Sequence, residues 1–114
     1  MTQILYIGND HQLIESLSSS ETTVFSFKSP VQAEKWLDKG GKPDAVLCEF
    51  EIPDSNAINF FRFFRKKYGW QHLVPLLILG EKISQEDIKK ALRLGIDDLF
   101  VIPVKAERII KRIV

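Results

Sequence analysis

The stretch Ala45-Val-Leu-Cys-Glu-Phe-Glu-Ile-Pro53 decides how this chain folds. It opens on an uninterrupted apolar run, Ala45 to Cys48, of the kind that forms a strand covered on both faces. Glu49 ends the run, at the carboxyl end of the predicted strand. In open parallel α/β sheets, ligands bind and chemistry occurs at that end of the strands. A carboxylate in this place is therefore a functional group or the remnant of one.

Length and composition describe one ordinary globular domain that spans residues 1–114. The 114 residues are 45% hydrophobic and 27% charged, and a net charge of +1 gives no pull toward nucleic acid or a membrane. The single cysteine, Cys48, excludes an internal disulfide and a cysteine-rich metal site, and its apolar surroundings favour a buried core residue. The chain opens without the basic and apolar regions of a signal peptide, and no window reaches the length of a transmembrane helix. We therefore expect a cytoplasmic domain.

Short apolar runs alternate with amphipathic stretches along the whole chain. Strands are predicted at 4–7, 23–27, 45–49, 74–79 and 98–102, helices at 11–18, 30–39, 56–67, 84–94 and 105–114, and a loop at 51–56. The predicted helix N-caps are Asp10 (or Asn9), Ser29 and Ser84. The last three strands lack polar alternation, so both of their faces should be covered. The pattern predicts an α/β fold, with a parallel sheet between two helix layers joined by right-handed βαβ units.

Five short motifs give the chain a resemblance to a known family. They are Pro43-Asp-Ala-Val-Leu47, Ile52-Pro53, Val74-Pro-Leu-Leu-Ile-Leu79, Ala91-Leu-Arg-Leu-Gly-Ile-Asp-Asp98 and Pro103 directly after the last strand. In order and spacing they resemble the receiver domain of bacterial two-component response regulators, over essentially the whole chain. The resemblance implies a flavodoxin-like (βα)5 three-layer sandwich whose parallel five-stranded sheet has the order 2-1-3-4-5. It also implies a cis peptide bond between Ile102 and Pro103.

The same resemblance implies a phosphorylation site, from which this chain departs at every position. A working receiver binds Mg²⁺ with two acids after the first strand and an aspartate that ends the third, and this aspartate takes a phosphoryl group from a histidine kinase. A Ser or Thr after strand four and a Lys after strand five bind the phosphoryl oxygens. The matching positions hold Gly8 and Asn9, then Glu49, Gly80 and Ile102, and Leu99 stands at the aromatic switch position.

These departures remove the groups that phosphoryl transfer needs. Mg²⁺ requires near-octahedral oxygen ligands, which Gly8 does not supply and Asn9 supplies only as a neutral carbonyl. Glu49 is one methylene longer than aspartate, so its oxygens miss the required place by about 1 Å. An apolar Ile102 disfavours an anion. We therefore predict a degenerate pseudo-receiver that lacks the phospho-acceptor aspartate, with no enzymatic activity, metal or cofactor.

Other functions stay open on the sequence. Asp10, Glu49 and Glu51 could form a rebuilt cation site, which would make the domain an atypical metal-dependent phosphotransfer receiver that uses Glu49; the plainer interpretation is a helix cap, a solvated carboxylate and a loop charge. Glu49 could also imitate the charge of an aspartyl phosphate. A flavin domain needs a phosphate-cradling loop after the first strand, and Gly8-Asn-Asp-His11, with one glycine and one acid, argues against it.

Candidate interaction residues lie on two surfaces, and the plainer interpretation of the charges on the first is a set of solvated helix side chains. One is the face of helix four, strand five and helix five, which receivers commonly use for dimers and output domains; its candidates are Lys89, Lys90, Arg93, Leu99, Val101, Lys105, Arg108 and Arg112, with Asp97, Asp98 and Glu107 as cross-subunit partners. The other is the third helix, where Phe63 should look outward and form an apolar patch with Trp70, or else pack down locally under Trp70. The basic run Arg65-Lys-Lys67 is better explained as a complement to the helix dipole than as a nucleic-acid site.

The end of the chain carries one further expectation. Ile109, Ile110 and Ile113 continue an apolar helical pattern up to the last residue. We therefore expect the N-terminal part of a longer protein with an output module downstream. The predicted function is a phosphorylation-independent signalling module that regulates an attached or partner output domain.

Overall fold

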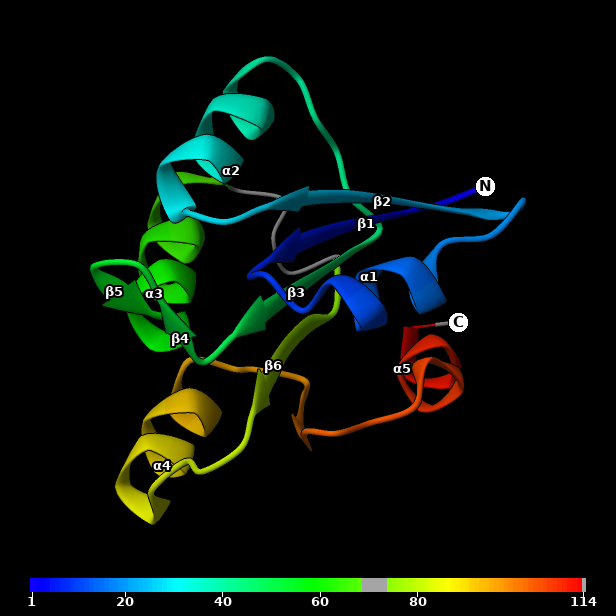
Figure 1. Cartoon of the computed structure of the whole chain (residues 1–114). Coiled ribbons are helices and arrows are strands. Elements are labelled where there is room, and N and C mark those ends of the chain that lie inside the picture. Colours follow the sequence, from blue (N-terminus) through cyan, green and yellow to red (C-terminus); the bar gives the residue numbers. More distant parts are fainter. Residues whose placement is uncertain (69–73, 114) are drawn as a thin grey trace.

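The computed structural model describes residues 1–68 and 74–113, and a five-stranded parallel sheet lies at its centre (Figure 1). The strands are β1 (Thr2–Ile7), β2 (Thr22–Phe27), β3 (Ala45–Glu49), β6 (Leu76–Gly80) and β7 (Asp98–Val101). They lie in the order β2-β1-β3-β6-β7, and every neighbouring pair is parallel. Counted along the sheet, this is the predicted order 2-1-3-4-5, so the flavodoxin-like fold is confirmed.

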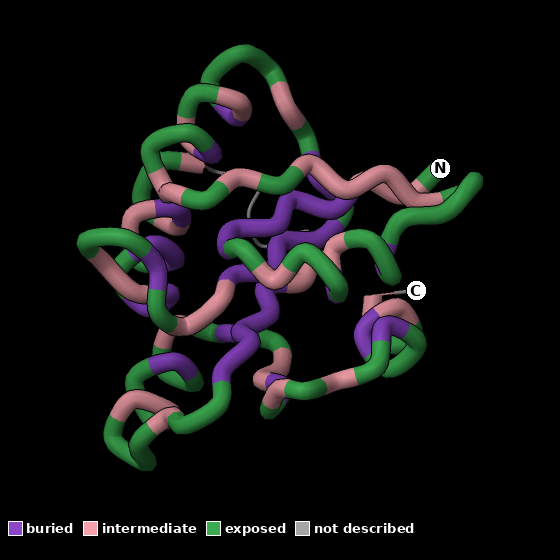
Figure 2. The backbone as a smooth tube through the Cα atoms, in the orientation of Figure 1, coloured by how far each residue is buried: buried purple, intermediate pink, exposed green. Residues whose placement is uncertain are grey.

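Helices cover both faces of the sheet. On one side lie α2 (Pro30–Asp38), α3 (Ala57–Lys67) and α4 (Gln85–Arg93), and on the other α1 (His11–Leu17) and α5 (Ala106–Ile113). Successive strand residues point to opposite faces, so β3 sends Val46 and Cys48 to the first layer and Ala45 and Leu47 to the second. Buried backbone is therefore concentrated in the central strands, as Figure 2 shows.

Three phenylalanines of α3 fill the larger of the two core layers. Phe60, Phe61 and Phe64 are buried against the sheet, as their helical spacing predicts. The ring centroid of Phe60 lies 5.5 Å from the ring centroid of Phe61 and 5.9 Å from that of Phe64. Burying each such side chain stabilises the fold by about 1.5–3 kcal/mol.

The helices begin where their capping residues predict. The side chains of Asp10, Ser29 and Ser84 accept hydrogen bonds from backbone N–H groups in the first turns of α1, α2 and α4. Asn56 caps α3 in the same way. The Ile102–Pro103 peptide bond is cis, as the family resemblance implied.

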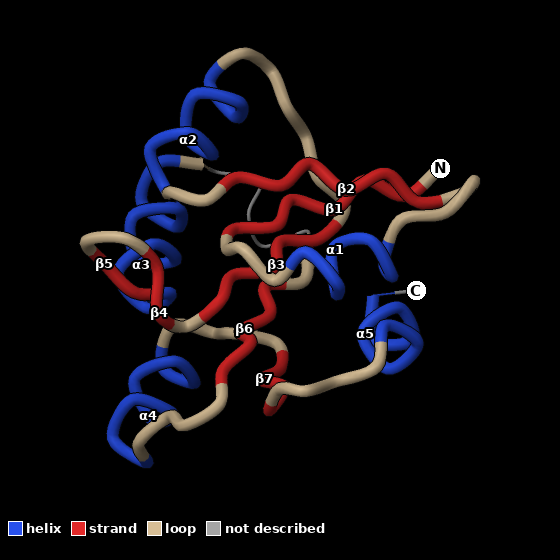
Figure 3. The backbone as a smooth tube through the Cα atoms, in the orientation of Figure 1, coloured by secondary structure: helices blue, strands red, loops and turns tan. Residues whose placement is uncertain are grey.

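The segment 51–56, predicted to be a loop, contains a small antiparallel hairpin instead (Figure 3). Its strands are β4 (Glu51–Ile52) and β5 (Ser55–Asn56). Pro53 and Asp54 form the turn between them, and Asp54 has a φ of 61°, a conformation that aspartate tolerates better than most residues. Two-residue strands are too short to show alternation, which explains why the sequence pattern missed them. Among the described residues, no helix combines the length and apolar character needed to cross a membrane.

Candidate functional site

The candidate site lies at the edge of the sheet where the parallel strands end. Glu49 is the last residue of β3, between β1 and β6, and it pairs in register with Leu79. Gly8 follows β1, Gly80 ends β6 and Ile102 follows β7, where its N–H donates to the Gly80 carbonyl at 3.1 Å. A hollow of about 390 Å³ opens here, lined by Glu49, Phe50, Glu51, Leu79, Gly80, Glu81, Lys82 and Ile102. The fold thus gathers the predicted pocket positions at one edge.

The Glu49 carboxylate is half-buried and is held by hydrogen bonds. Its Oε2 atom accepts from the Tyr6 hydroxyl at 2.6 Å, from the Asn9 N–H at 3.1 Å and from the Asp10 N–H at 3.0 Å. Tyr6 is fully buried, and burial together with the hydrogen bond to Glu49 holds the pKa of its hydroxyl far above the usual value. Glu49 therefore turns toward β1 and the β1–α1 loop.

Gly8 makes room for this arrangement. A Cβ atom at position 8 would lie 2.2 Å from Cδ and 2.3 Å from Oε2 of Glu49, and Gly8 has a φ of 150°. A side chain of any kind is thus excluded while Glu49 keeps its position. The space that the family resemblance assigns to an acid after strand one is filled by the acid that ends strand three.

The residues present do not fit a magnesium ion. Three donors already surround Oε2 of Glu49, and Gly8 contributes no side-chain ligand. Asp10 uses Oδ1 to accept from the Leu13 N–H at 3.1 Å, as a helix cap does, and Glu51 lies exposed on β4. In the described part of the chain, no cluster of three or more His, Cys, Asp or Glu side chains is arranged to hold a metal. The donors favour a hydrogen-bonded carboxylate over the rebuilt cation site.

The two remaining pocket positions are filled by apolar packing. A Cβ at Gly80 would lie 2.7 Å from Cδ1 of Ile83, which occupies the space a hydroxyl-bearing side chain would need. Ile102 packs against the core layer of α1 and α5. Lys82, which the sequence reasoning missed, lines the hollow from the β6–α4 loop. Nothing in its local sequence distinguishes it from other loop charges.

Tyr6 is the second residue that sequence reasoning missed. It lies in the apolar run Ile4-Leu-Tyr-Ile7, where the sequence indicates only that its ring is part of the hydrophobic core. A buried tyrosine hydroxyl usually has a hydrogen-bond partner, so a tyrosine within a predicted buried strand indicates that a polar partner lies nearby. The partner lies 43 positions away, so the sequence alone does not identify it.

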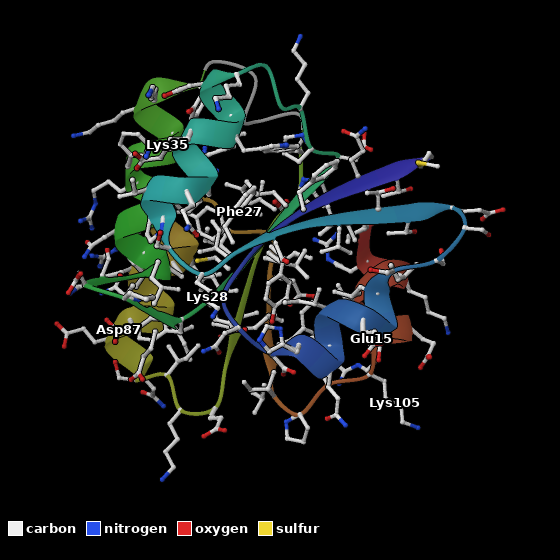
Figure 4. The ribbon with its side chains drawn as sticks, turned by 45° about the horizontal axis from the view of Figure 1, so that its top comes forward. Glu15, Phe27, Lys28, Lys35, Asp87 and Lys105 are labelled. Carbon is white, nitrogen blue, oxygen red and sulfur yellow. The ribbon has the colours of Figure 1, made fainter. Side chains whose placement is uncertain are left out.

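The predicted interaction residues of α4, β7 and α5 lie on the surface. Lys89, Arg93, Lys105 and Arg108 are exposed, as are Lys90 and Arg112; Val101 is 64% exposed and Leu99 is half-buried. A groove of about 590 Å³ runs between α4 and β7 and is lined by Gly80, Glu81, Lys82, Ile83, Ser84, Ile88, Leu99 and Val101. Lys105 and Glu15 extend on the α1/α5 side of the sheet, whereas Asp87 and Lys35 lie on the opposite side (Figure 4).

Some charges proposed for cross-subunit pairs are used within the chain. Nε of Arg112 lies 3.4 Å from Oδ2 of Asp98, and Arg112 also donates to the Asp97 carbonyl at 3.1 Å. The Asp97 carboxylate accepts from the Leu76 N–H at 2.8 Å. An interface that used Asp97 or Asp98 would have to replace these contacts.

Phe63 is half-buried rather than fully outward. It lines a groove of about 340 Å³ together with Val31, Pro53 and Phe60, between α2, α3 and the β4–β5 hairpin. The Lys67 ammonium lies 5.5 Å from its ring centroid. Trp70, the expected neighbour of Phe63, lies outside the described residues.

Comparison with known proteins identifies related sequences. The sequence model of the response regulator receiver domain matches residues 8–114. The Regulator of RpoS from Escherichia coli (strain K12) is 33% identical over 108 residues, which cover 90% of this chain and 31% of the relative. The regulatory protein VanR from Enterococcus faecium is 23% identical over 115 residues, which cover 97% of this chain and 48% of the relative. The chain thus spans less than half the length of either relative.

Solved structures show the same fold. The chemotaxis response regulator CheY4 of Vibrio cholerae superposes with a TM-score of 0.82 at 16% identity, over 100% of this chain and 99% of that chain. A two-component response regulator from Clostridium difficile gives 0.84 at 19% identity, over 99% of this chain and 93% of that one. With the sheet order and the match over residues 8–114, these findings show that the chain belongs to the response regulator receiver domain family.

Proposed function

We propose that this domain is a degenerate receiver that acts in signalling without being phosphorylated. One observation carries the proposal: the Glu49 carboxylate is bound by Tyr6, Asn9 and Asp10 in the space above Gly8. An oxygen that accepts three hydrogen bonds is a poor nucleophile, and these bonds turn the Glu49 carboxylate toward β1 and the β1–α1 loop.

The surroundings add to this argument. In phosphoryl transfer, charge spreads over three equatorial oxygens and has to be stabilised by metal ions, cationic side chains and hydrogen-bond donors. Ile102 and Gly80 bring neither a cation nor a hydroxyl to the edge where such a group would sit. Lys82 is exposed on a loop and shares the hollow with Glu49, Glu51 and Glu81, which oppose an incoming anion.

We infer that the domain regulates an output domain attached to it or a separate protein. The relatives named above are regulators, and this chain matches only part of each. It also matches 11% of the aerobic respiration control sensor protein ArcB of Escherichia coli, at 26% identity over 92 residues. A receiver that occupies part of a larger regulator acts through contacts with other modules.

The face of α4, β7 and α5 is the proposed contact surface, either for a partner or for a homodimer. Leu92 and Val101 are apolar and largely exposed there, at 67% and 64%. The groove beside them is apolar at Ile83, Ile88 and Leu99. Exposed apolar side chains within a charged rim are typical of protein contacts.

Phosphorylation can be tested directly on the purified domain. The protein is incubated with acetyl phosphate and Mg²⁺, or with beryllofluoride and Mg²⁺, and then examined by intact mass spectrometry and by amide NMR. We expect neither a stoichiometric mass increase nor shifts around Glu49. A phosphoryl adduct that disappears in Glu49→Gln would refute the proposal and favour metal-dependent phosphotransfer through Glu49.

The contact surface calls for a matched pair of variants. Val101→Asp places a charge on the proposed surface, and Val31→Asp does so on α2, where Val31 is 58% exposed. Self-association of the domain is measured by sedimentation velocity. We expect Val101→Asp alone to weaken the contact, and equal effects of the two variants would contradict the assignment of the surface.

A further inference from the structure

The contacts of Glu49 indicate that the sheet edge has become a site for a carboxylate. We propose that the Tyr6 hydroxyl and the backbone N–H groups of Asn9 and Asp10 form a carboxylate-binding site that Glu49 occupies from within the same chain. This inference rests on the proposed function, because a Glu49 that accepted phosphoryl groups could not remain the resident ligand.

The donors converge on a single oxygen atom. Oε2 of Glu49 lies 2.6 Å from the Tyr6 hydroxyl oxygen, 3.1 Å from the Asn9 nitrogen and 3.0 Å from the Asp10 nitrogen. Hydrogen bonds to an ionised acceptor are stronger than those between neutral groups. The site is thus matched to an anion with an exposed oxygen, which is what a carboxylate presents.

Tyr6 is the fixed part of the site. Its ring is 0% exposed, in the core layer formed with α1 and α5, and this packing holds the ring in place. Leu47 belongs to the same layer. Because strand residues two apart share a face, Glu49 projects from β3 on the side where Leu47 and Tyr6 lie.

Length and space select the ligand. The register pairs Ile7, the last residue of β1, with Cys48, so Glu49 lies beside Gly8, which directly follows β1. Glutamate has one more methylene than aspartate to carry its carboxylate across Gly8 to the loop. A Cβ at position 8 would lie 2.6 Å from Cγ of Glu49, which means that the path exists only above glycine.

Glu49, Gly8 and Tyr6 therefore act as one set. The Glu49 carboxylate holds the β1–α1 loop in place through the N–H groups of Asn9 and Asp10. The loop carries Asp10, whose carboxylate caps α1, so the site also positions the start of that helix. Tyr6 is a positioning residue in this arrangement.

Removing the internal ligand should open the site to a small carboxylate. Glu49→Ala keeps all three donors and leaves space for acetate. The folding equilibrium constant of Glu49→Ala is measured by urea unfolding in 0.2 M potassium acetate and in 0.2 M potassium chloride. For an acetate dissociation constant of about 0.1 M, mass action predicts an increase of about threefold in acetate over chloride.

Two controls separate this effect from general salt effects. Glu51→Ala removes an exposed acid two residues further on, and it should respond to acetate no more than the wild-type protein does. Tyr6→Phe combined with Glu49→Ala removes one donor and should lose most of the acetate effect. In Glu49→Ala, acetate should also shift the Asn9 and Asp10 amide resonances.

The outcomes separate this inference from the proposed function. Equal stability of Glu49→Ala in acetate and chloride, without shifts at Asn9 and Asp10, would overturn the carboxylate site even if the wild type resists acetyl phosphate. Phosphorylation of wild-type Glu49 would instead overturn the proposed function. If Glu49→Ala does not fold, Glu49→Gln keeps the side-chain length and removes the charge, and unchanged Asn9 and Asp10 amide resonances in that variant would count against the site.

Discussion

Replacing Gly8 by alanine should destabilise this domain much more than a change of one methyl group suggests. The new Cβ would lie 2.2, 2.3 and 2.6 Å from Cδ, Oε2 and Cγ of Glu49, whereas ordinary contacts begin near 3.4 Å. The backbone cannot relieve the contact without moving β1, so Glu49 has to leave. Its departure breaks the hydrogen bonds to Tyr6, Asn9 and Asp10.

The size of the effect follows from these losses. An unpaired buried group such as the Tyr6 hydroxyl costs about 1–3 kcal/mol, and because Glu49 is only half-buried we take about 2 kcal/mol for the whole set. Alanine at a φ of 150° adds strain of about 1–2 kcal/mol. Gly8→Ala should therefore lower the free energy of unfolding by about 3–4 kcal/mol, which a domain with the usual 5–15 kcal/mol can survive.

The strain and the contact can be separated experimentally. Gly40 has a φ of 103°, and a Cβ there would have no heavy atom within 4 Å, so Gly40→Ala measures strain without a contact. Glu49→Ala should cost about 2 kcal/mol by the loss of the same hydrogen bonds. The double change, Gly8→Ala with Glu49→Ala, should cost about as much as Gly8→Ala alone. Gly8→Ala by itself already displaces the Glu49 carboxylate, so removing that carboxylate adds no further loss of hydrogen bonds.

Equilibrium unfolding in urea, followed by far-ultraviolet circular dichroism and tryptophan fluorescence, measures all four variants. The double-mutant cycle should give a coupling of about −2 kcal/mol between positions 8 and 49. Additivity of the two changes within about 0.5 kcal/mol, or equal costs of Gly8→Ala and Gly40→Ala, would refute the reasoning.

Three further predictions concern other contacts. Burial and Glu49 raise the pKa of Tyr6, so its contribution to stability is complete below pH 10 and is lost at up to about 1.4 kcal/mol per pH unit above it; Tyr6→Phe should remove that slope in urea unfolding at pH 9–11. Gly41→Ala would place a Cβ 2.5 Å from the Trp36 ring, which stacks on Phe25, and should cost about 1–3 kcal/mol with a change in tryptophan fluorescence. Gly80→Ser would meet Ile83 at 2.7 Å, should cost about 1 kcal/mol in urea unfolding, and should not permit labelling by acetyl phosphate.

The fold was predictable because its signals are local. Apolar runs such as Val74 to Leu79 identify the covered strands, and Ser29 and Ser84 identify the helix starts, within a few residues of their structural positions. The burial of Phe60, Phe61 and Phe64 follows from helical spacing alone. Each of these features depends on neighbours in the sequence.

The details of the site were not predictable, because they depend on distant partners. The sequence places Glu49 at the end of β3, but Tyr6, 43 positions away, determines where its carboxylate points. Phe63 was expected to face outward, yet it lies half-buried beside Pro53, next to a hairpin too short to leave a sequence pattern. The hairpin that the sequence pattern missed is thus one of the elements that lie beside Phe63.

Gly8 and Glu49, two of the positions at which this chain departs from the receiver pattern, are linked physically. An acid at position 8 would collide with Glu49 for as long as Glu49 stays in place. An aspartate at position 49 would leave the buried Tyr6 hydroxyl without its acceptor, at a cost that a neutral change does not carry. Either change, an acid at position 8 or an aspartate at position 49, should therefore lower stability when made alone. Such interdependence is what an alternative, internally satisfied arrangement would produce, whereas independent losses would leave each position free to revert.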